Sequence, residues 1–155
     1  MKLLGLLFLT LAGVGGGILA ARNAEKATAQ TEETVRLLQF LLERIETYRE
    51  PLPEIFASFS SPVLTACGFL PAYPTAPETA LRRTLLSREL SESLLELSLS
   101  LDGCRSADCA AAAIRRTLRQ GEEEAKKLRE SLPARRKTAL TLGVSGWLLA
   151  LLLLW

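Results

Sequence analysis

Two long runs of hydrophobic residues lie at the two ends of the chain, on either side of a more polar middle region. Leu3 to Ala21 contains no charged residue, and Ala139 to Trp155 is equally uncharged and rich in leucine. As a helix with a rise of about 1.5 Å per residue, the first run spans roughly 28 Å, close to the hydrocarbon thickness of about 30 Å. The second run is at the short limit, but its leucines favour insertion. Each run predicts a transmembrane helix.

A different origin is conceivable for each run. The first resembles a secretory signal peptide, with Lys2 as a short basic region and a weak cleavage site near Ile18-Leu19-Ala20. The run is long for that role, and Leu19 and Arg22 make an untidy cleavage zone, so a retained anchor is favoured. The second run would be a buried core helix only inside a larger protein, because it is apolar on all sides.

Basic residues beside the two runs predict how the chain is oriented. Those facing the middle region are Arg22, Lys26, Arg135, Arg136 and Lys137, whereas only Lys2 lies outside it. Positively charged flanks favour the cytoplasmic side. The expected parts are an N-terminal transmembrane anchor over residues 1–21, a cytoplasmic helical bundle over residues 22–137 and a C-terminal transmembrane anchor over residues 138–155. The three basic residues before the second anchor form a membrane-proximal cluster suited to lipid headgroups or, as the less ordinary alternative, to a protein partner.

The first run also carries small residues at helical spacing. Gly13 and Gly17 form a GxxxG pair. Small residues allow two membrane helices to approach closely, although glycine is also simply tolerated in such helices. The pair predicts packing on another membrane helix or on a second copy of the chain.

In the middle region, apolar residues recur at spacings of three and four, which predicts helices and no strands. A first helix is expected over about Glu25 to Arg49, with one stripe made by Val35, Leu38, Leu41, Leu42, Ile45 and Tyr48. A structural turn at Pro51, Leu52 and Pro53 ends it, because a proline disfavours helical geometry in the preceding residue. A second helix is expected from Glu54 to about Phe59. Ser61 and Pro62 then end that helix or open another.

Further helices follow a predicted loop from Cys67 to Pro77. One is expected over Thr79 to Leu101, ended by Asp102-Gly103, with Ser106 or Asp108 capping the next. The last helix has a heptad seam made by Ile114, Leu118, Gly121, Ala125, Leu128 and Leu132, in which the small members allow close packing. Pro133 interrupts it or kinks it. The predicted fold class is all-α: an antiparallel bundle between N-terminal and C-terminal transmembrane helices, with the first and last bundle helices side by side.

Composition narrows the function. The net charge of +2 gives no case for nucleic-acid binding, since acids match the bases along the same helices. There is no histidine, no phosphate-binding loop and no acidic pair distinct from the surface pattern, so we expect no catalysis, no cofactor and no metal site. Cys67, Cys104 and Cys109 are interpreted as small, partly buried thiols. A disulfide between Cys104 and Cys109 is the less favoured alternative.

Several short motifs, in order, resemble one known family. They are Lys2-Leu3-Leu4-Gly5, the glycine-rich end of the first anchor with Ala21-Arg22, the turn Tyr48-Arg49-Glu50-Pro51-Leu52-Pro53-Glu54, and Leu142-Gly143 followed by Gly146 and a leucine-rich tail. This pattern is similar to the stage III sporulation protein AB family. The resemblance implies a non-enzymatic role in endospore formation, within a channel complex between mother cell and forespore. It also implies a bundle similar to the platform protein of type II secretion machines.

In that family's scheme, the bundle lies on the mother-cell side of the cell membrane and docks a cytoplasmic ATPase, while the anchors couple it to other membrane subunits of the complex. Two further functions stay open from the residues. One is a generic small membrane oligomer or pore-forming, membrane-shaping subunit built through Gly13 and Gly17. The other is a secreted, tail-anchored coiled-coil protein, which requires cleavage before about Arg22.

Overall fold

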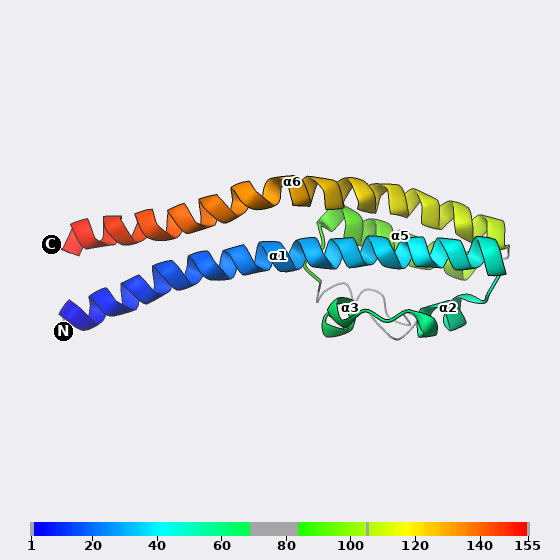
Figure 1. Ribbon diagram of the computed structural model, residues 1–155, viewed down its shortest axis with the longest axis horizontal. Coiled ribbons are helices and arrows are strands. Elements are labelled where there is room, and N and C mark those ends of the chain that lie inside the picture. Colours follow the sequence, from blue (N-terminus) through cyan, green and yellow to red (C-terminus); the bar gives the residue numbers. More distant parts are fainter. Residues whose placement is uncertain (1, 69–83, 105, 155) are drawn as a thin grey trace. The chain divides into compact units, whose positions relative to one another are not determined.

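The computed structural model describes residues 2–68, 84–104 and 106–154. Inside the helices it leaves out the side chains of residues 2–14, 136, 139, 140, 142–144 and 146–154. All regular elements in the described part are helices, which confirms the all-α class (Figure 1). They are α1 (Lys2–Tyr48), α2 (Leu52–Ser58), α3 (Pro62–Ala66), α5 (Arg88–Gly103) and α6 (Ala107–Leu154).

The chain divides into two compact units. One combines Met1–Lys26 with Arg129–Trp155, and the other is Ala27–Leu128. Helices α1 and α6 contribute residues to both units. We call Ala27–Leu128 the bundle unit, and it holds the buried core described below. The domain limits expected from the sequence stay a prediction.

The two expected membrane anchors are helical where the structure describes their backbone. Most of their side chains lie outside the described set. Across the described residues, no helix combines the length and the apolar character needed to cross a membrane. The anchors at residues 1–21 and 138–155 therefore stay predictions.

Helices α1 and α6 run antiparallel in the bundle unit. Gln39 Nε2 donates a hydrogen bond to Glu122 Oε1 at 3.1 Å, and Arg115 pairs with Glu46 further along. Gly121 of α6 faces α1 so closely that a Cβ placed there would lie 3.1 Å from Val35 Cγ2. This close approach confirms that the first and last bundle helices lie side by side, with a small residue of the heptad seam at their contact.

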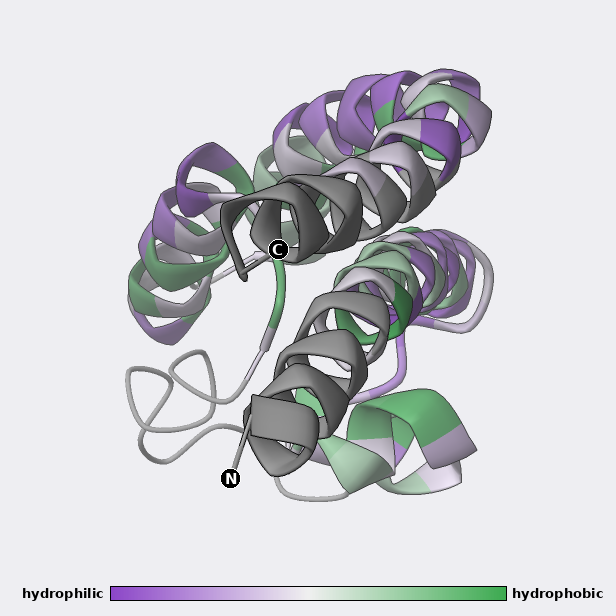
Figure 2. Ribbon diagram, turned by 90° about the vertical axis from the view of Figure 1, so that its left-hand side faces the viewer, coloured by the Kyte–Doolittle hydropathy of each residue, from purple (hydrophilic) through white to green (hydrophobic). Residues whose placement is uncertain are grey.

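One apolar core joins the described helices of the bundle unit. Its fully buried side chains come from α1, α2, α3, α5 and α6 and include Leu38, Leu41, Ile55, Leu64, Leu90 and Ile114. In Figure 2 the outer side of α6 is mostly hydrophilic, as expected for a helix that buries one face. Each helix contributes a buried leucine or isoleucine to this core. The buried side chains of α2 and α3 therefore anchor these short helices against the longer ones.

Serine side chains begin three of the helices. Ser61 Oγ accepts from the Leu64 N–H at 3.4 Å, Ser87 Oγ from Leu90 N–H at 3.2 Å, and Ser106 Oγ from Cys109 N–H at 3.2 Å. Each bond satisfies a backbone donor that a helix start leaves without a partner. The sequence predicted a helix boundary at Ser61 and a cap at Ser106 or Asp108, and it missed the cap at Ser87.

Several predicted helix limits are wrong. Residues 84–87 are not helical, so the helix expected from Thr79 begins at Arg88, after the Ser87 cap; residues 69–83 and the loop expected there lie outside the described residues. Helix α1 runs from the first hydrophobic segment into the bundle without a break. Helix α6 likewise continues through Pro133, which is exposed, so no interruption occurs there. Tyr48 is 61% exposed and does not join the buried stripe.

Candidate functional site

The turn predicted around Pro51 brings α2 back along α1. Pro51 has extended backbone angles (φ −67°, ψ 138°), and its carbonyl accepts hydrogen bonds from the N–H groups of Glu54 at 3.0 Å and Ile55 at 3.3 Å. Pro53 stands in the first turn of α2, where the missing N–H costs nothing. Leu52 packs at the edge of the core. These residues set the return of the chain, and the side-chain site lies just beyond them.

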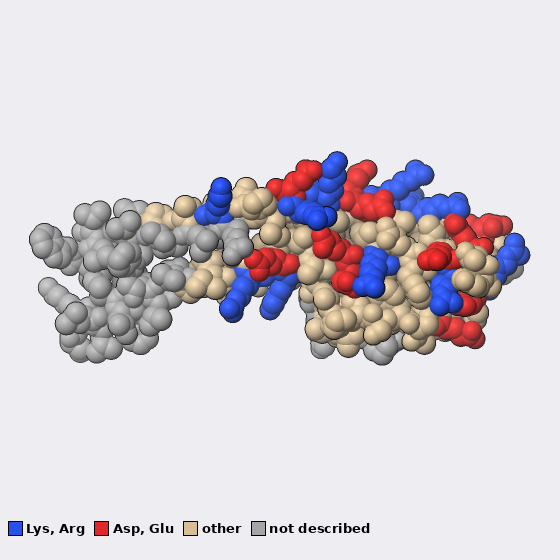
Figure 3. Space-filling view, in the orientation of Figure 1, with Lys and Arg blue, Asp and Glu red and all other residues tan. Residues whose placement is uncertain are grey.

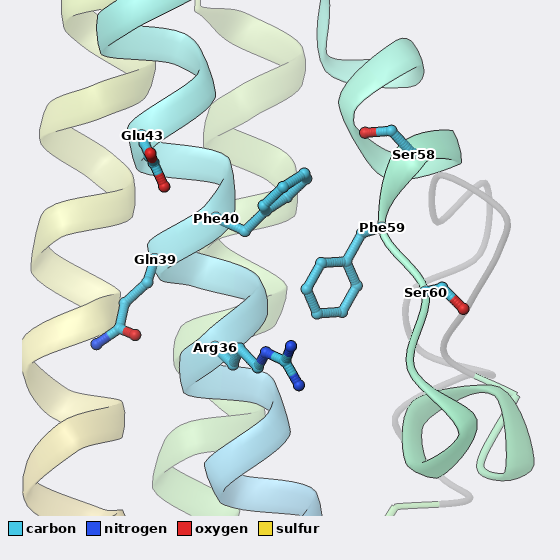
Figure 4. A pocket seen from close by; sticks show the side chains of 7 residues that line it. All are labelled: Arg36, Gln39, Phe40, Glu43, Ser58, Phe59 and Ser60. Carbon is cyan, nitrogen blue, oxygen red and sulfur yellow. The ribbon is translucent and has the colours of Figure 1, made fainter.

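A groove of about 380 Å³ lies between α1 and the segment that links α2 to α3. We call it the α1–α2 groove, and its lining residues are Arg36, Gln39, Phe40, Glu43, Ser58, Phe59 and Ser60. Figure 4 shows the first four on α1 and the last three on the facing segment, with the Phe40 and Phe59 rings pointing toward each other. A smaller hollow of about 110 Å³ lies between α5 and α6, beside Ser100 and Arg116.

Two aromatic rings, one from each wall of the groove, pack against each other. The centroids of Phe40 and Phe59 are 5.3 Å apart with the ring planes at 50°, a tilted pair that is favourable beyond its buried area. Phe59 is buried and Phe40 partly so. The backbone at Phe59 is extended (φ −83°, ψ 130°), so the link between α2 and α3 runs along α1.

Charges sit on one wall of the groove only. On α1, the Arg36 side chain is 69% exposed and holds a loose 3.5 Å ion pair with Glu33, and Glu43 is exposed one turn beyond Gln39. On the other wall, the described residues 55–68 carry no charge, and Ser58 Oγ donates to the Ile55 carbonyl at 2.8 Å. Figure 3 shows how densely acidic and basic side chains cover much of the remaining surface.

A second arginine on α1, Arg44, contacts two aromatic rings and an acidic residue near the groove. The Arg44 guanidinium lies 5.3 Å from the Phe40 ring centroid and 5.2 Å from that of Tyr48, and it pairs with Glu50 at 2.9 Å. These contacts tie the end of α1 to the proline turn. The groove therefore has one charged wall, one neutral wall and a pair of aromatic rings between them.

The residues singled out in the sequence do not meet at this groove. Gly17 is buried within its own unit while Gly15 and Gly16 are exposed, and the Gly13 side chain lies outside the described residues. Arg135 and Lys137 are exposed on α6, and the Arg136 side chain is outside the described set. Their expected membrane roles stay predictions.

The sequence did not predict the groove residues. The apolar stripe through Leu38 and Ile45 indicates the buried face of α1, whereas the groove lies along the neighbouring face. Leu37, Phe40 and Arg44 on that face also recur at spacings of three and four. Neither that pattern nor Phe59 alone indicates a groove. The groove arises only because the proline turn brings the segment around Phe59 back along α1. In the described residues no group of three or more His, Cys, Asp or Glu side chains is placed to hold a metal ion.

The described part of the chain is thus a helical bundle with a groove beside α1. The family model described as stage III sporulation protein AB matches residues 2–70 of this chain. Over those residues the match supports the resemblance to this family that the sequence motifs indicate. No curated protein and no solved structure matches the chain.

Proposed function

We propose that this chain is a membrane-anchored assembly subunit of a sporulation channel complex, and that its bundle unit docks a cytoplasmic ATPase of that complex through the α1–α2 groove. The proposal includes two membrane anchors, a bundle on the mother-cell side and no catalytic activity of its own. The channel partners come from the family resemblance, whereas the groove comes from the structure.

The observation that carries the proposal is where the groove falls in the chain. All its lining residues, from Arg36 to Ser60, lie inside the stretch matched by the family model, residues 2–70. The hollow between α5 and α6 lies wholly outside that stretch. A docking surface for a family-specific partner is expected within the family-specific part of the chain.

The character of the groove fits protein docking. The cores of protein interfaces are depleted of charge, and the uncharged wall around Ser58 and Ser60 costs little free energy to desolvate. The exposed Arg36 guanidinium at the rim offers five donors for a carboxylate on the partner. Its pairing with Glu33 is solvent-exposed and long, so it competes only weakly. We therefore expect the docked segment of the ATPase to combine an apolar or aromatic side chain with an acidic one.

Binding of the purified partner tests the docking proposal. The full chain, reconstituted in lipid nanodiscs, would be titrated with the ATPase of the same complex. Ser60→Trp fills the groove from an exposed position, and Arg36→Glu reverses the rim charge. Each substitution is expected to weaken binding by about tenfold or more.

Matched controls come from α5, which contributes no residue to the groove. Ser100→Trp places the same bulk at an exposed position of α5, and Arg88→Glu removes an exposed arginine that, like Arg36, pairs within its own helix. Both are expected to bind as tightly as the unaltered chain. If the control variants lose binding and the groove variants keep it, the ATPase docks elsewhere and the proposal is wrong.

Membrane topology is tested separately. Thr65 is exposed on α3, so Thr65→Cys in a chain with Cys104→Ser and Cys109→Ser provides one accessible thiol. In intact sporulating cells a membrane-impermeant maleimide should not label it until the membrane is permeabilised. Labelling in intact cells would place the bundle unit outside the cytoplasm and would remove a cytoplasmic ATPase as its partner.

A further inference from the structure

The turn between α5 and α6 brings two cysteines together. Helix α5 ends at Gly103, Cys104 is extended (φ −76°, ψ 118°), and Cys109 lies in the first turn of α6. The two Cα atoms are 5.8 Å apart and the side chains form a disulfide. That separation lies within the usual range of about 4.4–6.8 Å. The interpretation of these cysteines as separate thiols is therefore wrong, and the less favoured pairing is the one the structure contains.

The two sulfurs of this pair have different surroundings. Cys109 is exposed, whereas Cys104 is half-buried and packs with Ala107 against the end of the core. The Cys109 N–H is held by Ser106 Oγ at 3.2 Å, so Cys109 stands within the positive end of a long helix. The exposed Cys109 sulfur is open to attack by another thiol, and the helix N-terminus stabilises the Cys109 thiolate that is released once the resulting mixed disulfide is cleaved.

The third cysteine provides an internal contrast. Cys67 is 5% exposed, and its thiol donates to the Val63 carbonyl at 2.9 Å. Burial raises the pKa of the Cys67 thiol above its ordinary value. Since the thiolate is the reactive form, Cys67 is expected to be inert while the chain is folded.

We propose that Cys104 and Cys109 form a thiol–disulfide exchange site for low-molecular-weight thiols, which breaks and re-forms the covalent link between the end of α5 and the start of α6 while the core stays folded. This site goes beyond the proposed docking function and does not depend on it.

The exchange is a two-electron reaction in two steps. A low-molecular-weight thiolate attacks the exposed Cys109 sulfur, forms a mixed disulfide there and releases Cys104 as a thiolate. A second small thiolate attacks the sulfur of the first in that mixed disulfide, releases Cys109 as a thiolate and leaves as the small-molecule disulfide. Both cysteine thiolates then take up protons from water, and the reverse sequence consumes the small-molecule disulfide as oxidant.

The core explains why opening stays local. Leu101 on α5 and Ala110, Ala111 and Ile114 on α6 are buried immediately beyond the turn, and Arg115 pairs with Glu46 of α1. These contacts hold both helices after the sulfurs separate. Reduction should therefore loosen only Cys104 and the first turn of α6. It should lower the unfolding midpoint by roughly 5–10 °C, because an unfolded chain without the disulfide has more conformational freedom.

Alkylation of the full chain in detergent tests the proposal. The protein is equilibrated in buffers of reduced and oxidised glutathione, quenched with N-ethylmaleimide and measured by intact mass and peptide mapping. We expect no adduct on Cys104 or Cys109 in oxidised glutathione, and two adducts appearing together as the reduced form increases. Cys67 should react only after denaturant is added.

Three outcomes would overturn the proposal. Alkylation of both Cys104 and Cys109 in fully oxidised buffer would mean that the pair does not form. Resistance of the pair to reduction until the protein is denatured would make it a permanent structural bridge. Loss of the bundle on reduction, measured by far-UV circular dichroism, would contradict local opening.

The Cys109→Ser variant completes the test, since the replaced side chain is exposed and the variant should fold with the lower unfolding midpoint of the reduced chain. It should show one adduct on Cys104 under all conditions except in oxidised glutathione, where Cys104 carries a glutathione instead. A Cys109→Ser protein whose melting still depends on the glutathione ratio would show that the effect arises elsewhere.

Discussion

Helix α1 makes two contacts of opposite kind in the bundle unit. Against α6 it approaches closely, since a Cβ added to Gly121 would lie only 3.1 Å from Val35 Cγ2. Against the link between α2 and α3, the Phe40 and Phe59 rings keep the backbones apart and leave a groove of about 380 Å³. Small residues thus give α1 a tight contact with α6, and large aromatic residues leave an open groove on another side of it.

The largest effect is expected where α2 is anchored. Ile55 has no exposed surface, so Ile55→Ala should lower the free energy of unfolding by about 3 kcal/mol through lost burial and a cavity. It should also weaken partner binding, because the neutral wall of the groove loses its support. Denaturant unfolding in detergent measures the first effect. Leu99→Ala, at a residue 65% exposed, is the matched control and should change stability by less than about 0.5 kcal/mol.

The tight contact is tested by adding volume. Gly121→Leu should cost about 2–3 kcal/mol, because the side chain meets Val35 and Leu90. Gly103→Leu is the control, since nothing lies within 4 Å of a Cβ there, and it should be nearly neutral in the same denaturant unfolding experiment. Equal costs at both glycines would show that α1 and α6 do not meet as described.

Much of this contrast follows from local sequence rules. The end of α1 at the proline turn, the helix boundary at Ser61 and the seam through Ile114 and Gly121 all follow from short-range patterns. The predicted start of α5 was too early, because Leu81, Leu85 and Leu86 continue the leucine spacing of the helix. The helix in fact begins only after the Ser87 cap. Leu85 is in fact 44% exposed, with its N–H donating to Gln30 Oε1 at 2.6 Å.

The groove and the disulfide depend on contacts that no spacing rule contains. Phe40 and Phe59 are separated by a turn and a helix, and only the buried anchors Ile55 and Leu64 decide which ring faces which. Cys104 and Cys109 are near in sequence, yet their pairing depends on the direction in which α6 leaves the turn. The features proposed to carry function are tertiary, whereas the helices that hold them are local.

A smaller effect is expected at the start of α3, which ends the neutral wall. Ser61 is buried and its side chain accepts from the Leu64 N–H, so Ser61→Ala should cost about 1 kcal/mol. Thermal unfolding of the variant checks this value. Ser100→Ala, an exposed serine inside α5, should cost much less, and a similar loss in both would argue against the cap.

The smallest effect is expected at the strained residue that begins the proline turn. Arg49 has φ 53°, a left-handed conformation that glycine adopts readily and arginine does not. Arg49→Gly should therefore raise the free energy of unfolding by up to about 1 kcal/mol, measured by denaturant unfolding. Arg119→Gly, in the interior of α6, should lower it by a similar amount. Destabilisation in both variants would mean that Arg49 makes contacts that outweigh its strain.

Site-specific crosslinking in sporulating cells tests the central claim most directly. A photo-reactive amino acid would replace Ser60 in the α1–α2 groove or, in a parallel strain, Ser100 on α5. We predict a crosslink between the Ser60 position and the cytoplasmic ATPase of the channel complex, and none from the Ser100 position. Crosslinks to that ATPase from Ser100 alone, or from neither position while the complex is intact, would contradict the claim that this groove is the docking surface.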